Sequence, residues 1–145
     1  MIQITPRMFF SAKPVRKAAD RATRAVLSKA GAFVRRTARS SIRRRKRTAR
    51  PGEPPSSHKG HLRRLIFFGY ERQRRIVVVG PAPLGRRSPY GPTTVPEVLE
   101  EGGTVAARED GERVRRRYRG HPFMGPAMEK ELPKFPTLWK DSIRR

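Results

Sequence analysis

The sequence predicts an α+β fold, with a long N-terminal helix and a C-terminal helix packed on an antiparallel sheet of about four strands. Apolar residues recur at helical spacing in the first third of the chain, whereas its middle contains short segments rich in β-branched and aromatic residues. The expected order is helix, loop, two strands, loop, two strands and helix, which is typical of an α+β domain. With 145 residues, 35% of them hydrophobic, the chain is expected to form a single domain over residues 1–145 with one modest core.

The N-terminal helix is expected over residues 14–40. Pro14 suits a first helical turn, because the N–H group that proline lacks would have no partner there. Most basic residues fall off the apolar stripe, and its many alanines would let the helix lie close to a sheet or another helix. The stripe consists of Val15, Ala18, Ala19, Ala22, Val26, Ala30, Phe33, Val34 and Thr37.

A basic, proline-rich and flexible loop is expected over residues 41–61. A charge run followed by Pro, Gly and Ser residues interrupts regular structure and stays solvated until an acidic partner binds it. Such a run could neutralise several phosphates, so we expect it to contact DNA or an acidic protein. The run consists of Arg43, Arg44, Arg45, Lys46 and Arg47.

Two strand pairs are expected in the second half of the chain. The first pair covers residues 62–70 and 72–80, which are rich in β-branched and aromatic side chains. The second pair covers residues 104–108 and 113–119, with a turn at Asp110-Gly111. Asp-Gly is a strong turn signal, so both pairs are expected to be antiparallel hairpins.

Residues 62–145 are expected to combine this sheet with helical segments. A short helical turn over residues 95–101 would lie between the strand pairs, closed by the two glycines that follow it. The last helix is expected over residues 124–140. Pro133 and Pro136 must break or kink it, because proline cannot donate the helical hydrogen bond.

The charge of the chain restricts its partners. Lys and Arg number 35 against 12 Asp and Glu, a formal net charge of +23. Self-repulsion of this size disfavours a compact monomer, so we expect a partner of opposite sign, which on charge alone could be nucleic acid, an anionic membrane or an acidic protein. Arginine pairs bidentately with phosphate and carboxylate alike and does not decide between them. No apolar run approaches the roughly 20 residues of a membrane-spanning helix, so we expect no membrane partner.

The sequence offers no catalytic or cofactor site. It contains no cysteine, and although His58 and His61 are three residues apart, no acids or thiols complete a metal site beside them. Glu97, Glu100 and Glu101 form a small acidic group, but no nearby nucleophile or orienting histidine accompanies it. We therefore expect a non-enzyme without metal or cofactor, in which these acids pair with basic residues.

Four motifs in order carry a family resemblance. They are Gly-His-Leu-Arg-Arg-Leu-Ile at residues 60–66, Val-Val-Val-Gly-Pro at 77–81, Val-Pro-Glu-Val-Leu-Glu-Glu-Gly-Gly at 95–103, and Tyr-Arg-Gly-His-Pro-Phe-Met-Gly-Pro-Ala-Met at 118–128. Over about residues 51–143 the chain resembles the tail-completion, or head–tail joining, proteins of long-tailed bacteriophages. It departs from that pattern at His121, where the family usually has Arg before the proline, and before Gly60, where Thr or Ser is common.

The resemblance implies a structural virion protein that assembles in the bacterial host cytoplasm and helps to attach tail to head. It implies an α+β subunit of a homo-oligomeric ring in the neck, next to a tail terminator, the tail tube or the head connector, with possible contact to packaged DNA. We expect the subunit interface to include Glu97, Glu100, Glu101, Phe123 and Met124, although plain core packing is an equal interpretation of the last two.

The alternative function is a basic nucleic-acid-binding protein of ribosomal or nucleoid type. The charge of +23 motivates it, but the sequence shows no helix-turn-helix spacing, stacking aromatics of an RNA-recognition motif or zinc finger. A nucleic-acid binder should bind as an isolated chain with strong salt dependence, whereas a ring subunit should need a protein partner.

Overall fold

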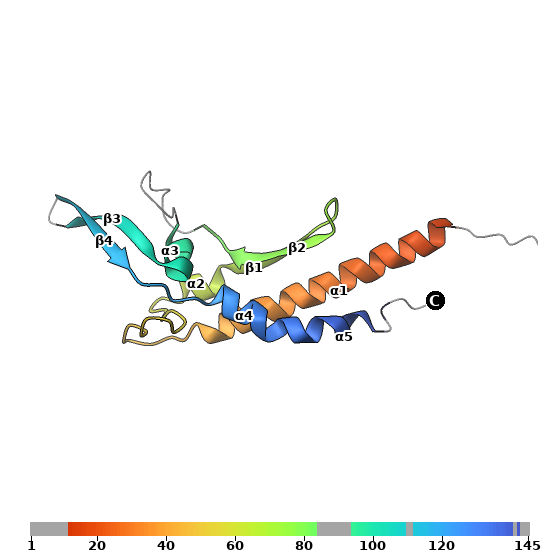
Figure 1. The fold of residues 1–145 in the computed structure, drawn as a ribbon, viewed down its shortest axis with the longest axis horizontal. Helices are drawn as coiled ribbons and strands as arrows, with labels where there is room; N and C mark the ends of the chain where they lie inside the picture. The colour runs from red at the N-terminus through yellow and green to blue at the C-terminus, as the bar shows by residue number, and fades with distance from the viewer. Residues whose placement is uncertain (1–11, 84–93, 110–111, 141, 143–145) are drawn as a thin grey trace, which may run out of the picture.

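A computed structural model describes residues 12–83, 94–109, 112–140 and 142 of the chain. The molecule is elongated and is built along one long helix, α1, with a β-hairpin on one side and shorter helices on the other (Figure 1). The α+β class predicted from the sequence is confirmed. The elements in chain order are α1 (Ala12–Ser41), α2 (His61–Arg64), β1 (Ile66–Glu71), β2 (Ile76–Pro81), α3 (Val95–Glu101), β3 (Gly103–Glu109), β4 (Glu112–Tyr118), α4 (Met124–Glu131), the 3-10 helix η1 (Leu132–Lys134) and α5 (Phe135–Trp139).

The single sheet of about four strands was a wrong prediction. In the described residues β1 pairs with β2 and β3 pairs with β4, as two separate antiparallel ribbons. The second ribbon extends beyond the end of α1 (Figure 1). Consecutive residues of a strand point to opposite faces, so Arg115, Arg116 and Arg117 place charge on both faces of β4. A ribbon that is charged on both faces cannot cover the apolar side of α1.

The helix α1 extends slightly beyond the expected bounds, and its buried residues follow the predicted stripe from Ala22 onward, whereas Val15 is 54% exposed. Its start at Ala12 places Pro14 in the first turn. At its end, the Ser40 and Ser41 hydroxyls donate to the carbonyls of Thr37 and Ala38, three residues earlier in each case. Such local bonds compete with the helical ladder, and the helix stops there. Its buried residues are Ala22, Val26, Ala30, Gly31, Val34 and Ala38.

The β1–β2 hairpin starts later than predicted. Residues 62–65, expected to be strand, form the helical turn α2 and its end, because Gly60 adopts a left-handed conformation and Leu62 turns into the core. The hairpin turn lies at residues 72–75, two residues later than the turn expected around residues 70–73. The predicted turn at Asp110-Gly111 lies outside the described residues, although both flanking strands are present.

Small residues let the hairpin approach α1 closely. A side chain on Gly31 would start 2.7 Å from Val77 Cγ2 and 3.1 Å from Phe68 Cδ2, so only glycine fits there. Phe68 pairs with Val79, and Tyr70 with Val77, on the face of the ribbon that meets the helix. The alternate residues of both strands point away from α1.

The core lies at one end of the molecule, where α1 ends, β1 begins and α4 crosses. Phe123, Ile42 and Ile66 are its largest fully buried side chains. Val34, Ala38, Leu62 and Ala127 complete the buried cluster. The rest of α1, toward its N-terminus, extends away from this core.

The basic segment between α1 and α2 has no helix or strand, as expected for a loop. Ala49, Pro55 and Ser57 are nevertheless buried along it. The Ser57 N–H donates to the Arg43 carbonyl at 3.0 Å, which closes the segment on itself.

The C-terminal helix is interrupted as the prolines predict. Pro133 lies in the first turn of η1 and Pro136 in the first turn of α5, so the expected helix over 124–140 is divided into α4, η1 and α5. Both prolines occupy positions where the missing N–H removes no helical bond. The three pieces run beside α1, on the side away from the first hairpin (Figure 1).

Replacing Gly31 with alanine should destabilise the protein. The added methyl would overpack against the rigid Val77 side chain, which typically costs about 1–3 kcal/mol, against a gain of at most about 1 kcal/mol in helix propensity. Urea denaturation should therefore give a lower free energy of unfolding. Gly69→Ala is the matched control, because nothing lies within 4 Å of its added methyl, and greater stability of Gly31→Ala than of wild type would contradict the packing.

Candidate functional site

The last two sequence motifs meet at one junction, where Glu100 caps α4. Its carboxylate accepts hydrogen bonds from the backbone N–H groups of Phe123 (2.8 Å), Met124 (3.0 Å) and Gly125 (2.8 Å). The first N–H groups of a helix have no partner within the helix, and negative charge there is also favoured by the helix dipole. Glu100 belongs to α3, so this contact joins two elements that are distant in sequence.

Two glycines allow the backbones to touch at the same junction. A side chain on Gly102 would start 2.9 Å from both Gly120 N and Tyr118 O, and its φ of +77° is a left-handed conformation. The Gly102 N–H closes α3 by donating to the Val98 carbonyl at 2.9 Å, and the His121 N–H donates to the Leu99 carbonyl. The segments before and after the second hairpin are therefore fixed to each other at its base.

The basic loop is attached to this junction as well. The Gly52 N–H donates to the Gly120 carbonyl at 3.1 Å. The Nδ1 of His121 lies 3.0 Å from the Glu53 carbonyl, which can only accept, so the ring donates from that nitrogen. His121, which departs from the resembled family's pattern, thus links the loop to the base of the second hairpin.

The structure separates the acids that the sequence groups together. Glu97 accepts from the Thr94 N–H at 3.0 Å in a capping box at the start of its own helix, Glu100 caps α4, and Glu101 is exposed. Phe123 is 1% exposed and belongs to the core, and Met124 packs at the edge of that core. Of the five residues expected at a subunit interface, the structure therefore leaves Glu97 and Glu101 exposed.

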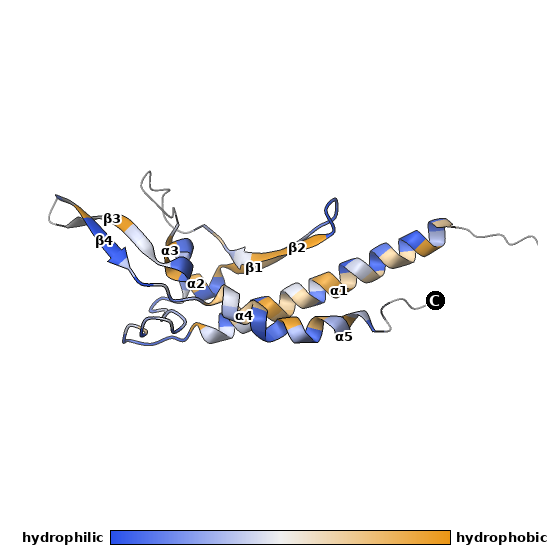
Figure 2. Cartoon of the chain, viewed as in Figure 1, coloured by the Kyte–Doolittle hydropathy of each residue, from blue (hydrophilic) through white to orange (hydrophobic). Residues whose placement is uncertain are grey.

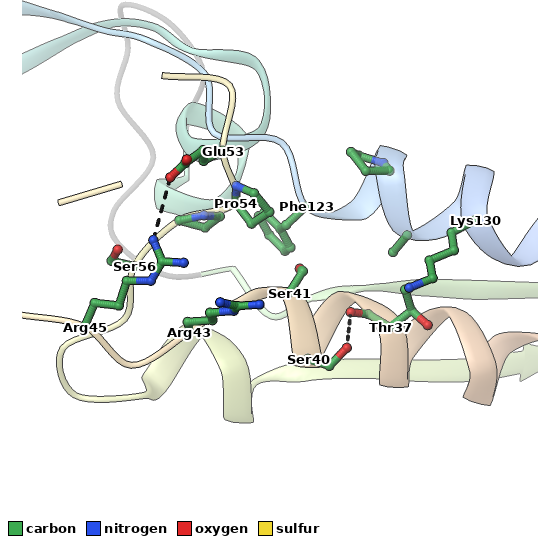
Figure 3. A pocket seen from close by; sticks show the side chains of 13 residues that line it. Thr37, Ser40, Ser41, Arg43, Arg45, Glu53, Pro54, Ser56, Phe123 and Lys130 are labelled. Atoms are coloured by element: carbon green, nitrogen blue, oxygen red, sulfur yellow. Dashed lines mark hydrogen bonds and ion pairs between the residues drawn. The ribbon is translucent and has the colours of Figure 1, made fainter. Parts of the chain in front are cut away.

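The five residues of the basic run, 43–47, are all exposed. Within this run, Arg45 lies 3.7 Å from Glu53, in an exposed ion pair of the kind that contributes little stability. Arg43 and Arg45 also line a pocket of about 480 Å³ together with Lys130 and the hydroxyls of Ser40, Ser41 and Ser56 (Figure 3). The Ser40 and Ser41 hydroxyls donate to backbone carbonyls, whereas the buried Ser56 hydroxyl has no hydrogen-bond partner among the described residues. The cations would favour an anionic group there, and the Glu53 carboxylate, which also lines the pocket, opposes it.

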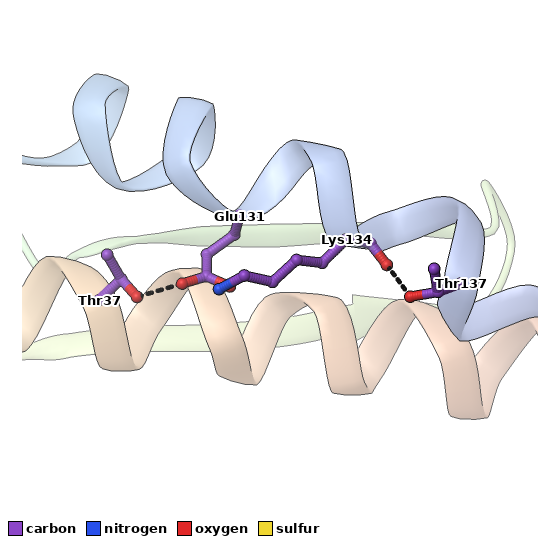
Figure 4. A network of polar contacts seen from close by, with 4 residues as sticks. All are labelled: Thr37, Glu131, Lys134 and Thr137. Atoms are coloured by element: carbon purple, nitrogen blue, oxygen red, sulfur yellow. Dashed lines mark hydrogen bonds and ion pairs between the residues drawn. The ribbon is translucent and has the colours of Figure 1, made fainter.

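A buried carboxylate links α4 to α1. The Thr37 hydroxyl donates to Glu131 Oε1 at 2.6 Å, and Lys134 Nζ donates to Oε2 at 2.8 Å (Figure 4). The hydrogen bond from Lys134, and then that from Thr37, lower the pKa of Glu131 below its ordinary value of 4.5, although burial opposes this. Because Glu131 is only 5% exposed, its negative charge depends on Lys134 and Thr37 more than on water.

Apolar side chains remain exposed on two sides of the molecule. The outer face of the first hairpin presents Phe67, 51% exposed, and Val78, 58% exposed, beside Ile76. In Figure 2 much of these two strands is orange, whereas the turn between them is blue. Met128, Leu132 and Trp139 are also exposed along the helices that follow the junction.

Comparisons with protein-family models, with curated proteins and with solved structures found no match to this chain.

The described residues contain no group of three or more His, Cys, Asp or Glu side chains that could hold a metal ion. No helix in the described part of the chain is long and apolar enough to cross a membrane.

Sequence reasoning missed two features. Nothing in the sequence marks Glu131 as buried, because its partner Thr37 is 94 residues away. The second feature is a basic face on α1, where Arg16, Arg21 and Arg24 face the turn of the first hairpin. Their helical spacing was the available signal, but without the hairpin it indicates only a solvated helix surface.

Replacing Glu100 with glutamine should lower the free energy of unfolding by about 1–3 kcal/mol, because the neutral amide loses charge-assisted bonds to three N–H groups. Glu101→Gln, one residue along and exposed, is the control and should stay within about 0.5 kcal/mol of wild type. Equal effects of the two substitutions in urea denaturation would argue against the cap.

The contribution of Glu131 should depend on pH. Because folding lowers its pKa, the ionised carboxylate stabilises the protein above about pH 4.5, and this stability is lost as the pH falls through the lower folded-state pKa. The difference in melting temperature between wild type and Glu131→Gln should therefore be largest near neutral pH and shrink toward pH 3. Glu129→Gln, on the exposed side of the same helix, should show no such trend. A difference that is constant from pH 7 to pH 3 would rule out this role of the ionised carboxylate.

Proposed function

We propose that this chain is a structural subunit of a closed homo-oligomeric ring at the head–tail joint of a tailed bacteriophage, where it helps to attach the tail to the head. Assembly into an oligomer is supported by two exposed apolar surfaces on opposite sides of α1. One is the outer face of the first hairpin, and the other lies along α4 and α5 (Figures 1 and 2).

Two different surfaces suit a ring. In a head-to-tail contact, one surface of each subunit meets a different surface of the next, and a closed ring forms if the rotation closes. Exposed Phe67 and Val78 on one side and Leu132 and Trp139 on the other provide such a pair. Contiguous exposed apolar patches of this kind mark interaction sites on soluble proteins.

The two ribbons also favour an assembled state. An isolated two-stranded hairpin is marginally stable in water, and β3–β4 packs mainly against the short helix α3. In the described residues both ribbons have unpaired edges, which are templates for pairing with another chain. A neighbouring subunit or tail protein would cover them.

The phage part of the proposal rests on the sequence resemblance. The structure supports it in one respect, because the motifs at residues 95–103 and 118–128 form one junction through Glu100, Gly102 and Gly120. Motifs that hold an architecture together are what a structural subunit needs, and the described residues present no convergent catalytic group. The expected neighbours are a tail terminator, the tail tube or the head connector, in the virion neck.

The test is the mass of the purified, nuclease-treated protein in high salt, measured by light scattering. The wild type should form a discrete oligomer of several copies. Val78→Ser, on the outer face of the first hairpin, should reduce this mass. Val95→Ser is the matched control, because Val95 is similarly exposed but lies outside both apolar surfaces, and it should leave the mass unchanged.

A wild-type chain that stays monomeric at every concentration, and that tail-tube and connector proteins do not recruit, would refute the proposal. Loss of the oligomer in both variants would place the contact elsewhere. In tailed particles from a host that produces this chain, antibody labelling at the neck would test its location.

A further inference from the structure

A basic cleft lies between the N-terminal half of α1 and the turn of the first hairpin. The hairpin packs closely on α1 at Gly31, but its turn rises away from the helix toward the N-terminus (Figure 1). The resulting cleft has a volume of about 810 Å³. Its helix wall includes Arg16, Arg21 and Arg24, and its hairpin wall includes Arg72 and Arg75.

The same face of α1 forms the packed region and the cleft. Residues 13, 17, 20, 24 and 31 follow one another at three, four or seven positions and therefore share a face of the helix. The residue on this face is small at Gly31, and the face becomes basic from Arg24 toward the N-terminus. The turn of the hairpin is basic as well, so like charges oppose each other where the ribbon leaves the helix.

One ion pair bridges the two walls. Asp20 Oδ1 on α1 lies 3.0 Å from Arg75 on the hairpin. Among the described residues that line the cleft, Asp20 is the single acid against five basic residues of α1 and three of the turn. Arg74 is paired with Glu71 at 3.4 Å, whereas Arg16, Arg21, Arg24 and Arg72 have no carboxylate within 4.0 Å in the described part of the chain.

The positive charge of the cleft suits a nucleic-acid backbone. In the described part of the chain, five basic residues of α1 and three of the hairpin turn line it with a single acid. Residues 13–24 span about 16 Å of helix axis at 1.5 Å per residue. One strand of DNA carries roughly five charges over that length, at one per 3.4 Å. An extended peptide of consecutive acids carries about as many, at 3.3 Å per residue, so the other residues that line the cleft distinguish the two ligands.

The composition of the walls points the same way. The centres of protein–protein interfaces are depleted in charged residues, whereas protein–nucleic-acid interfaces are polar and strongly basic. Tyr70 is the one aromatic residue that lines the cleft, and no aliphatic side chain lines it in the described residues. The exposed apolar side chains of the molecule lie on other surfaces.

We propose that this cleft binds the phosphodiester backbone of nucleic acid without sequence preference. Arg16, Arg21 and Arg24 contact phosphates from the helix, and Arg72 does so from the hairpin. The Asp20–Arg75 ion pair bridges the two walls. This site is distinct from the exposed run at residues 43–47, and it does not depend on ring formation.

The test compares two triple variants of the full chain with equal loss of charge. The first, Arg16→Gln/Arg21→Gln/Arg24→Gln, removes the helix wall but keeps good helix formers. The second, Arg44→Gln/Lys46→Gln/Arg47→Gln, is the control in the basic run. Binding of a fluorescent 30-base-pair DNA duplex is measured by anisotropy between 50 and 200 mM NaCl, after nuclease treatment of the protein and a circular-dichroism check of helix content.

The cleft variant should bind at least about tenfold more weakly at 100 mM NaCl. The slope of log K against log salt should become less steep by roughly 2–3, since each lost phosphate contact contributes about 0.9. The variant of the basic run removes the same charge outside the cleft and should change the slope by less than the cleft variant does. Arg72→Gln, on the opposite wall, should reduce the slope by about 1 without touching α1.

Several outcomes would overturn the proposal. Equal losses in the two triple variants would mean that binding follows net charge, and a loss confined to the control would assign binding to residues 43–47. Tighter binding of a fluorescent polyglutamate peptide than of the duplex, lost in the cleft variant, would assign the cleft to an acidic protein. Because the readout is DNA binding and not mass, its failure is distinguishable from failure of the proposed assembly.

Discussion

The contact between the Glu100 carboxylate and the first N–H groups of α4 determines how the outer parts of the molecule are placed. Through it, the short helix α3 is tied to the helix that carries Phe123 into the core. The close approach of Gly102 and Gly120 then fixes the base of the second hairpin, and the Gly52 bond to Gly120 ties the basic loop to the same place.

The remainder of the architecture follows from a small core in a strongly charged chain. The buried cluster occupies the C-terminal end of α1, where Val34, Ala38 and Ile42 meet α4 and the start of β1. Toward the N-terminus the helix is basic on the face that meets the hairpin turn, and a cleft lies between the two. Along this one helix, small residues pack closely against the hairpin, and charged residues line the cleft.

Apolar and basic surfaces are separated on this molecule. Exposed apolar residues lie on the outer face of β1–β2 and along α4, η1 and α5, whereas the cleft between α1 and the hairpin turn is lined mainly by cations. The two kinds of surface suit two kinds of contact: desolvated packing between protein subunits, and screened attraction to a polyanion. A ring subunit beside a DNA channel would use both at once, and the formal charge of +23 is easier to understand if a polyanion offsets it.

The sequence by itself determined the elements whose signals are local. The stripe on α1, the short helix α3 with its proline and following glycines, the two hairpins and the proline breaks after α4 all result from periodicity, turn chemistry or capping within a few residues. Tertiary structure alone decided that the strands form two ribbons and that residues 62–65 turn into the core. It also decided that Glu100 caps a helix and that Glu131 is buried against Thr37. These outcomes depend on partners 23 to 94 residues away, and the pattern around a carboxylate does not show which distant N–H or hydroxyl group it will meet.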